Sequence, residues 1–290
     1  GSGQRARLAQ AGALLVGLLL VNLQQAPPVE QDAQLQHDLG EVLLRNKSFA
    51  ASAAHSRQAV ALEPDYPSAW HNLAVALLGL EQPRQAEGAA HSALALHPAR
   101  ADTRIVLARS LLALGQQQSG LAQLQHAAEQ EPDNSDVQYA IGRLLLQMER
   151  PGDALPHLQK AAQLRPVDYW AHYDLGRVLH RIGRLSEALK AFDHASKISP
   201  TRADALSAAG AVALSSGDAE LARGYLNSAL TADADYLPAR INLGLLEVGA
   251  GRYQIGIDLL EAVVHRAASP NQIWSALAHA YQATGETQKA

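Results

Sequence analysis

The sequence contains no cysteine, a single methionine and only 4% aromatic residues among its 290 positions. Without cysteine there can be no disulfide framework, no cysteine-liganded zinc site and no thiol nucleophile. The scarcity of aromatic and β-branched residues argues against a β-sandwich. A formal net charge of −4 argues against a strongly basic nucleic-acid binder, and 48% hydrophobic residues argue against a disordered chain. What the sequence does have is alanine, about one residue in five, which is typical of helical proteins.

The prolines and alanines reveal an internal repeat. Prolines recur at intervals of 34 residues, and an alanine precedes each of them by five places. These prolines are Pro64, Pro98, Pro132, Pro166 and Pro200. Seven complete units can be placed without an insertion, and half a unit follows them. The units begin at residues 33, 67, 101, 135, 169, 203 and 237, and the half unit begins at residue 271.

Each unit has the apolar spacing of two amphipathic helices. In the unit that begins at residue 67, Trp70, Leu73, Ala74 and Leu77 lie at i, i+3, i+4 and i+7. A glycine recurs between the two halves of a unit, where a positive φ angle can end the first helix. These glycines are Gly115, Gly183, Gly217 and Gly251. Proline then ends the second helix, and the recurrent small residues predict close helix crossings.

This pattern resembles the tetratricopeptide repeat (TPR) family over about residues 33–290. Trp70 and Trp274 match the tryptophan of the family signature, Phe192 matches its second-helix aromatic and Tyr281 its first-helix aromatic. The resemblance implies an all-α fold, a right-handed superhelical solenoid of antiparallel helix pairs. It also implies a non-catalytic scaffold whose first helices line a concave groove that binds a protein or peptide.

In this family, positions 2, 5, 6, 9 and 12 of each first helix face the groove. Position 9 is arginine in three consecutive units, at Arg109, Arg143 and Arg177. Neighbouring helices pack roughly 8–10 Å apart, so these side chains would form a ladder of guanidinium groups. Their mutual repulsion is only about 0.4 kcal/mol per pair in water at about 10 Å, and guanidinium binds carboxylates in a bidentate manner. We therefore predict a partner with an acidic segment.

Aromatic and further basic residues extend this predicted binding surface across the units at residues 101–202. Tyrosine, tryptophan and arginine dominate the energetics of protein interfaces, which favours a partner-binding role. The additional residues are Tyr139 and Tyr173 at position 5, Trp170 at position 2, His180 at position 12 and Arg181 beside it. Asp102 and Asp136 at position 2 could instead neutralise the arginines, or stabilise helix N-termini.

Asparagine occupies position 6 in two units, at Asn72 and Asn242, which are also candidate partner-binding residues. In the TPR region of O-GlcNAc transferases, asparagines at this position form a ladder that holds peptide backbone. Here other residues interrupt the ladder between these two positions. The carboxylate clamp of chaperone-binding TPRs needs lysine and asparagine where His37 and Glu41 stand, which disfavours recognition of a chaperone C-terminus.

No motif for catalysis is visible. No pair of the twelve histidines has the H-E-x-x-H spacing of a zinc site, and no P-loop, G-x-S-x-G or dinucleotide-binding turn occurs. We therefore predict no catalytic residues, no metal site, no cofactor and no nucleic-acid partner. An alternative function is the substrate-recruiting region of a larger enzyme, such as a glycosyltransferase.

Residues 1–29 differ from the repeats at 30–290. Arg5 and Arg7 precede the uncharged stretch Leu8–Leu23, an arrangement typical of an export signal or membrane anchor. Arginines before the stretch would keep the N-terminus cytoplasmic, so the repeats would be extracytoplasmic or periplasmic. The alternative is a cytoplasmic protein in which this stretch packs on the solenoid.

The last half unit, from residue 271, lacks a second helix to cover its first helix. Repeat arrays need capping at both ends, so either the native chain continues or this face pairs with another chain. Self-assembly through open solenoid ends is therefore a third candidate function.

Overall fold

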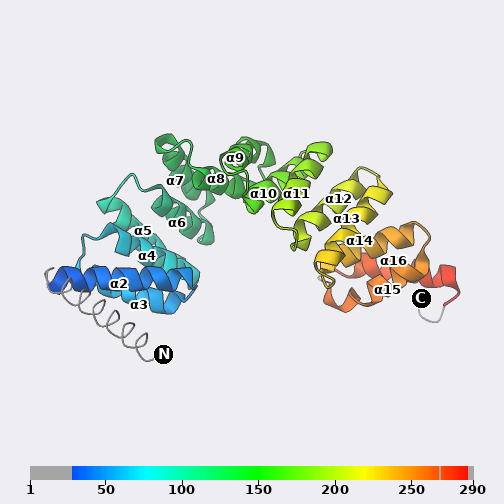
Figure 1. The fold of residues 1–290 in the computed structure, drawn as a ribbon, viewed down its shortest axis with the longest axis horizontal. Helices are drawn as coiled ribbons and strands as arrows, with labels where there is room; N and C mark the ends of the chain where they lie inside the picture. Colours follow the sequence, from blue (N-terminus) through cyan, green and yellow to red (C-terminus); the bar gives the residue numbers. More distant parts are fainter. Residues whose placement is uncertain (1–27, 268, 287–290) are drawn as a thin grey trace, which may run out of the picture. The chain divides into compact units, whose positions relative to one another are not determined.

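A computed structural model describes residues 28–267 and 269–286 of the chain. Over these residues it contains the α-helices α2 to α16 and one short 3₁₀ helix, without any β-strand, which confirms the predicted all-α fold. The chain divides into two compact units, one ending at Pro132 and the other beginning at Asp133. The helices follow one another in chain order from α2 to α16 (Figure 1).

The N-terminal unit consists of three antiparallel helix pairs. Each first helix packs on its own second helix, and α2 and α4 also pack on the first helix of the next pair. The helices are α2 (Pro28–Arg45), α3 (Phe49–Leu62), α4 (Pro67–Gly79), α5 (Pro83–Leu96), α6 (Ala101–Ala113) and α7 (Gln117–Gln130).

The C-terminal unit continues the same alternation through four pairs and a final helix. Its helices are α8 (Ser135–Gln147), α9 (Pro151–Leu164), α10 (Tyr169–Arg181), α11 (Leu185–Ile198), α12 (Ala203–Ser215), α13 (Ala219–Ala232), α14 (Leu237–Gly249), α15 (Tyr253–Glu261) and α16 (Asn271–Thr284). The helix α15 is the short one, with nine residues, and the 3₁₀ turn Val264–Arg266 follows it. From α4 onward, every first helix begins 34 residues after the previous one.

The turn inside each pair uses one left-handed residue at the same repeat position. Gly115, Gly183, Gly217, Gly251 and Gly285 have φ angles between 76° and 83° there. This confirms the positive φ predicted for the first four of these glycines, and its reason is that glycine adopts this conformation without a Cβ clash. The equivalent residues Lys47, Glu81 and Glu149 adopt positive φ angles without being glycine.

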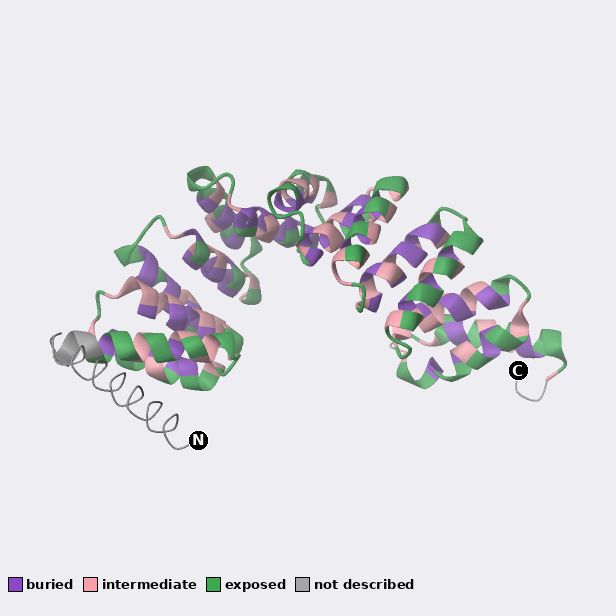
Figure 2. Ribbon diagram, in the orientation of Figure 1, coloured by how far each residue is buried: buried purple, intermediate pink, exposed green. Residues whose placement is uncertain are grey.

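Small residues at the helix crossings have a direct steric reason in the C-terminal unit. A Cβ atom on Gly142 would lie 2.5 Å from Leu158, and one on Gly176 would lie 2.8 Å from Phe192. Only glycine therefore permits this approach of α8 to α9 and of α10 to α11. The buried residues lie mainly where helices face each other, and the exposed ones gather in the turns (Figure 2).

The predicted anchor, export signal or packing segment at residues 8–23 lies outside the described residues. Among the helices that the structure does describe, none is both long and apolar enough to cross a membrane.

Candidate partner-binding surface

The three position-9 arginines are all exposed on first helices, at Arg109 on α6, Arg143 on α8 and Arg177 on α10. Arg109 belongs to the N-terminal unit and, within the described part of the chain, makes no ion pair or side-chain hydrogen bond. Arg143 and Arg177 lie in the C-terminal unit, and the fold brings these two together. Two of the three arginines of the predicted ladder thus lie together in one unit.

A buried carboxylate joins the two arginines of the C-terminal unit. The Oδ1 atom of Asp174 accepts a hydrogen bond from Nη1 of Arg177 at 2.9 Å. Its Oδ2 atom accepts one from the Tyr139 hydroxyl at 2.9 Å and lies 3.7 Å from Nε of Arg143. The aspartate is 97% buried, while the side chains of Arg143 and Arg177 stay 57% and 48% exposed. One negative charge thus offsets part of two positive charges.

Sequence analysis did not assign Asp174 this role. It identified Asp102 and Asp136 as possible counter-charges, but these pair with Arg100 and Arg165 respectively. The sequence does contain one indication of this contact. Asp174 occupies a groove position three residues before Arg177, which places both side chains on the same helix face. Burial, together with the charge of Asp174, raises the pKa of the Tyr139 hydroxyl, so this hydroxyl is a donor at neutral pH.

The aromatic residues of α10 form a cluster that includes two predicted residues, Trp170 and Tyr173. Their ring centroids are 5.7 Å apart in an edge-on arrangement, and Tyr173 stacks on Tyr169 at 5.9 Å. The guanidinium carbon of Arg202 lies 4.4 Å from the Tyr169 ring centroid and 4.3 Å from that of Trp170. Arginine over aromatic rings at these distances is a cation–π contact. Trp170 remains 44% exposed, so one edge of the cluster is open to a partner.

Arg202 and Tyr169 converge on the carboxylate of Asp204. Arg202 donates from Nη2 to Oδ2 at 2.7 Å, and the Tyr169 hydroxyl donates to Oδ1. Partial burial tends to raise the pKa of Asp204, but the bonds from Arg202 and Tyr169 outweigh it and lower that pKa. Neither donor could be identified from the groove positions of the repeat. Arg202 precedes α12, and Tyr169 stands at position 1, which is outside the positions assigned to the groove.

Of the remaining predicted residues, His180 and Arg181 contact other side chains of the fold, whereas no side-chain hydrogen bond is seen for the two asparagines among the described residues. His180 lies with Nε2 3.1 Å from the Ser215 hydroxyl, and Arg181 donates from Nη1 to Glu149 at 2.9 Å. Asn72 in the N-terminal unit is buried, and its side-chain nitrogen has no hydrogen-bond partner. Asn242 in the C-terminal unit is half-buried on α14.

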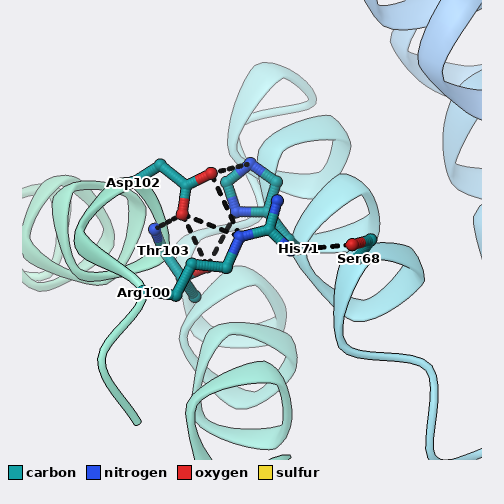
Figure 3. A network of polar contacts seen from close by, with 5 residues as sticks. All are labelled: Ser68, His71, Arg100, Asp102 and Thr103. Carbon is teal, nitrogen blue, oxygen red and sulfur yellow. Dashed lines mark hydrogen bonds and ion pairs between the residues drawn. The ribbon is translucent and has the colours of Figure 1, made fainter. Parts of the chain in front are cut away.

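A second polar network connects two repeats of the N-terminal unit (Figure 3). Arg100 donates from Nε to Asp102 at 2.8 Å and from Nη1 to the Ser68 hydroxyl at 2.9 Å. His71 is 2.9 Å from the Thr103 hydroxyl through Nδ1, and its Nε2 is 3.7 Å from Asp102. Burial lowers the pKa of His71, although the charge of Asp102 opposes that effect. The network holds α4 against α6.

A second buried carboxylate in the C-terminal unit also pairs with two arginines, and these are less exposed. Glu247 on α14 is almost completely buried and accepts from Nε of Arg223 at 2.7 Å and from Nε of Arg252. Those two arginines are less exposed than Arg143 and Arg177. Across the described residues, no group of three or more histidine, aspartate or glutamate side chains could hold a metal ion.

Family models of the tetratricopeptide repeat match residues 77–144 and 139–203. No curated protein sequence matches the chain. Among solved structures, YrrB, described as a TPR protein with an unusual peptide-binding site, is 25% identical with a TM-score of 0.54. The match covers 63% of this chain and 95% of YrrB.

Two further structures resemble the fold at lower identity. The pilF protein of Pseudomonas aeruginosa has a TM-score of 0.63 and 18% identity, covering 74% of this chain and 97% of that one. The Cut9–Hcn1 hetero-tetramer of the APC/C has a TM-score of 0.64 and 16% identity, covering 92% of this chain and 51% of that one. The repeat models over residues 77–203, the helix register and these structures together support a protein of the tetratricopeptide repeat family.

Proposed function

We propose that the chain is a non-catalytic scaffold whose C-terminal unit binds an acidic segment of a protein or peptide. The binding surface consists of Tyr139, Arg143, Trp170, Tyr173 and Arg177, called here the α8–α10 surface. The observation that carries the proposal is the exposure of two arginines around the single buried carboxylate of Asp174.

The hydrogen-bonding capacity of the two guanidinium groups supports this proposal. A guanidinium group carries five N–H donors, and Arg177 directs one of them at hydrogen-bond distance to Asp174. Arg143 is held at the longer distance of 3.7 Å, so its donors are also available. Because Asp174 orients both groups, an incoming carboxylate would find donors whose side-chain freedom is already restricted. Less conformational entropy is then lost on binding.

The net charge at the α8–α10 surface also favours an anionic ligand. Two arginines and one aspartate leave a local surplus of positive charge, whereas Arg181 is matched by Glu149 and Arg202 by Asp204. The open edge of Trp170 adds an apolar contact next to this charge. YrrB, a TPR protein of similar fold, is described as having a peptide-binding site, which supports a peptide as the kind of ligand.

The proposal is tested with a fluorescent glutamate-rich peptide and a matched peptide that carries glutamine in place of glutamate. We expect the acidic peptide to bind and the glutamine peptide to bind at least about tenfold more weakly, because hydrogen bonds to charged groups contribute about 1.5–3 kcal/mol. The double variant Arg143→Gln with Arg177→Gln should lose a similar factor for the acidic peptide. Raising the salt concentration should weaken binding as well.

The control is Arg184→Gln, which removes one positive charge from the same unit, as each of Arg143→Gln and Arg177→Gln does alone. Arg184 is the residue before the second helix α11 and pairs with Glu187, outside the α8–α10 surface. Its substitution should leave the peptide affinity unchanged. Equal loss in the control and the double variant, or equal binding of both peptides, would refute the proposal.

A further inference from the structure

The first helix of the described chain carries an exposed apolar stripe. Leu35, Leu39 and Val42 on α2 are 49%, 39% and 53% exposed. Their spacing of i, i+4 and i+7 places them on one face of the helix. Large apolar side chains aligned in this way are costly to leave in water, so the stripe indicates a surface that something covers.

The repeat register shows what covers this face elsewhere. Counting from residue 33, the stripe occupies positions 3, 7 and 10 of its unit. In the next unit these positions are Ala69, Leu73 and Ala76, which are all buried. They lie in one core cluster with residues of α3, the second helix of the preceding unit.

Position 3 of this face is buried in every later unit, since each of its occupants is at most 2% exposed. These occupants are Ala69, Thr103, Val137, Ala171, Ala205, Ala239 and Ile273. The stripe on α2 is therefore the site where a preceding second helix packs in the later units, and at position 3 it carries leucine where the others carry a smaller residue or isoleucine.

We propose that residues 8–23 cover this stripe and take the place of that preceding second helix. The stretch is uncharged and rich in leucine, so its side chains match an apolar face. The connection also has the right length. Four residues separate α3 from α4, α5 from α6 and α9 from α10, and four residues lie between Leu23 and the start of α2 at Pro28.

The length of the stretch favours α2 over a lipid bilayer as its neighbour. As a helix, sixteen residues would extend about 24 Å and the 18 residues of α2 about 27 Å, at about 1.5 Å per residue. The hydrocarbon core of a bilayer is about 30 Å thick. Pro27 and Pro28 would end a helix that arrives from the N-terminal side, as a turn back onto α2 requires.

Disulfide trapping in the full chain tests this packing, because the natural sequence has no cysteine. Leu39 lies eleven residues into α2, so an antiparallel segment that ends at Leu23 would bring residues near Gly12 opposite it. Leu39→Cys is therefore combined in turn with a single cysteine at each of Ala11, Gly12, Ala13 and Leu14, which together sample every face of one helical turn. A disulfide needs Cα atoms about 4.4–6.8 Å apart. We therefore expect one or two of the four pairs to form an intramolecular bond under mild oxidation.

Asp38→Cys provides the matched control, because Asp38 is exposed at position 6, where this family faces its groove. It should not be trapped with any of the four segment positions. As a second measurement, the single Leu39→Cys thiol should react with a maleimide about tenfold more slowly than the Asp38→Cys thiol, as expected for a buried site that opens only transiently.

Three outcomes would overturn the proposal. Trapping with Asp38→Cys would place the segment on the groove side instead. Disulfide-linked dimers would show that a second copy covers the stripe. A freely reactive Leu39→Cys thiol would show an uncovered stripe, and flotation of that protein with phosphatidylethanolamine–phosphatidylglycerol vesicles would identify residues 8–23 as a membrane anchor.

Discussion

The same three residues, arginine–alanine–aspartate, occur at equivalent positions in the two units and have different surroundings. Arg100 and Asp102 stand at the start of α6, and Arg202 and Asp204 stand three repeats later at the start of α12. In both places the arginine pairs with the aspartate across one alanine and contacts the preceding first helix.

The neighbour on the preceding helix differs between the two sites. In the N-terminal unit it is the partly buried His71, together with the Ser68 hydroxyl. In the C-terminal unit it is a pair of aromatic rings, Tyr169 and Trp170. One local motif therefore connects successive repeats in both units. The residue opposite decides whether that connection responds to pH or adds to an aromatic binding surface.

The largest expected effect comes from removing the residue that faces each aspartate. Tyr169→Ala should lower the free energy of unfolding by about 3 kcal/mol, because a buried ring and a hydrogen bond to Asp204 are both lost. His71→Ala should cost less, about 1–2 kcal/mol, because a smaller side chain and its polar contacts are removed. Urea denaturation of the two variants measures both. Equal costs would contradict the distinction drawn between the two sites.

Replacing each arginine with lysine isolates the role of the planar guanidinium group. Arg202→Lys should cost about 1–2 kcal/mol, because an ammonium group cannot lie flat against two rings and also pair with Asp204. Arg100→Lys should cost under about 1 kcal/mol, since lysine can preserve a partly exposed ion pair. The same urea titrations provide the comparison. A larger loss at Arg100 would show that the aromatic rings do not stabilise Arg202.

The N-terminal site should also be sensitive to mild acid. Burial lowers the pKa of His71 below its ordinary value of 6.5, even though Asp102 opposes the shift. The unfolded chain then binds the proton more readily, so stability falls as pH drops below about 6.5 towards the lowered pKa. His71→Gln should remove this part of the pH dependence. Urea midpoints at pH 7.5 and pH 5.5 measure it, and an unchanged slope in the variant would exclude His71 as its source.

The smallest effects concern the left-handed turn residues, where the two units differ in their use of glycine. Glu81→Gly should stabilise the N-terminal unit by about 0.5 kcal/mol, because a φ of 58° strains any residue with a Cβ atom. Gly183→Ala in the C-terminal unit should lower the free energy of unfolding by about 0.5–1 kcal/mol, because alanine is strained at a φ of 79°. A steric clash does not contribute, since no neighbouring atom lies within 4 Å of the added Cβ. Thermal unfolding of each variant checks the signs, and matching signs would contradict the strain argument.

The helical repeats could be predicted because each depends on short stretches of chain. Apolar spacing, turn glycines and closing prolines act within a few residues, and the 34-residue period gave seven independent chances to see them. The 34-residue spacing of the helices is unchanged in the sixth unit, which lacks the closing proline. The helix α13 ends at Ala232 although Ala234 stands where other units have proline, and the Asp233 side chain accepts from the Asp235 amide in the turn that follows.

The charge pairing of the candidate surface could not be predicted in the same way. Tyr139 and Asp174 are 35 residues apart, and their contact depends on how closely α8 approaches α10. Asp174 stands at position 6, where the asparagine ladder is interrupted, and its burial is invisible in the sequence. Arg202 was missed because rules for positions inside the first helix do not extend to the residue that precedes it.

The order of residues alone therefore specified the number and pairing of the helices, because these follow from local stereochemistry repeated along the chain. The folded arrangement decided which charges meet. It paired Asp102 and Asp136 with arginines outside the predicted ladder and left Asp174 between Arg143 and Arg177. The physical reason is that an ion pair forms over a few ångströms. Those distances arise only when two helices have packed and their side chains have taken their directions.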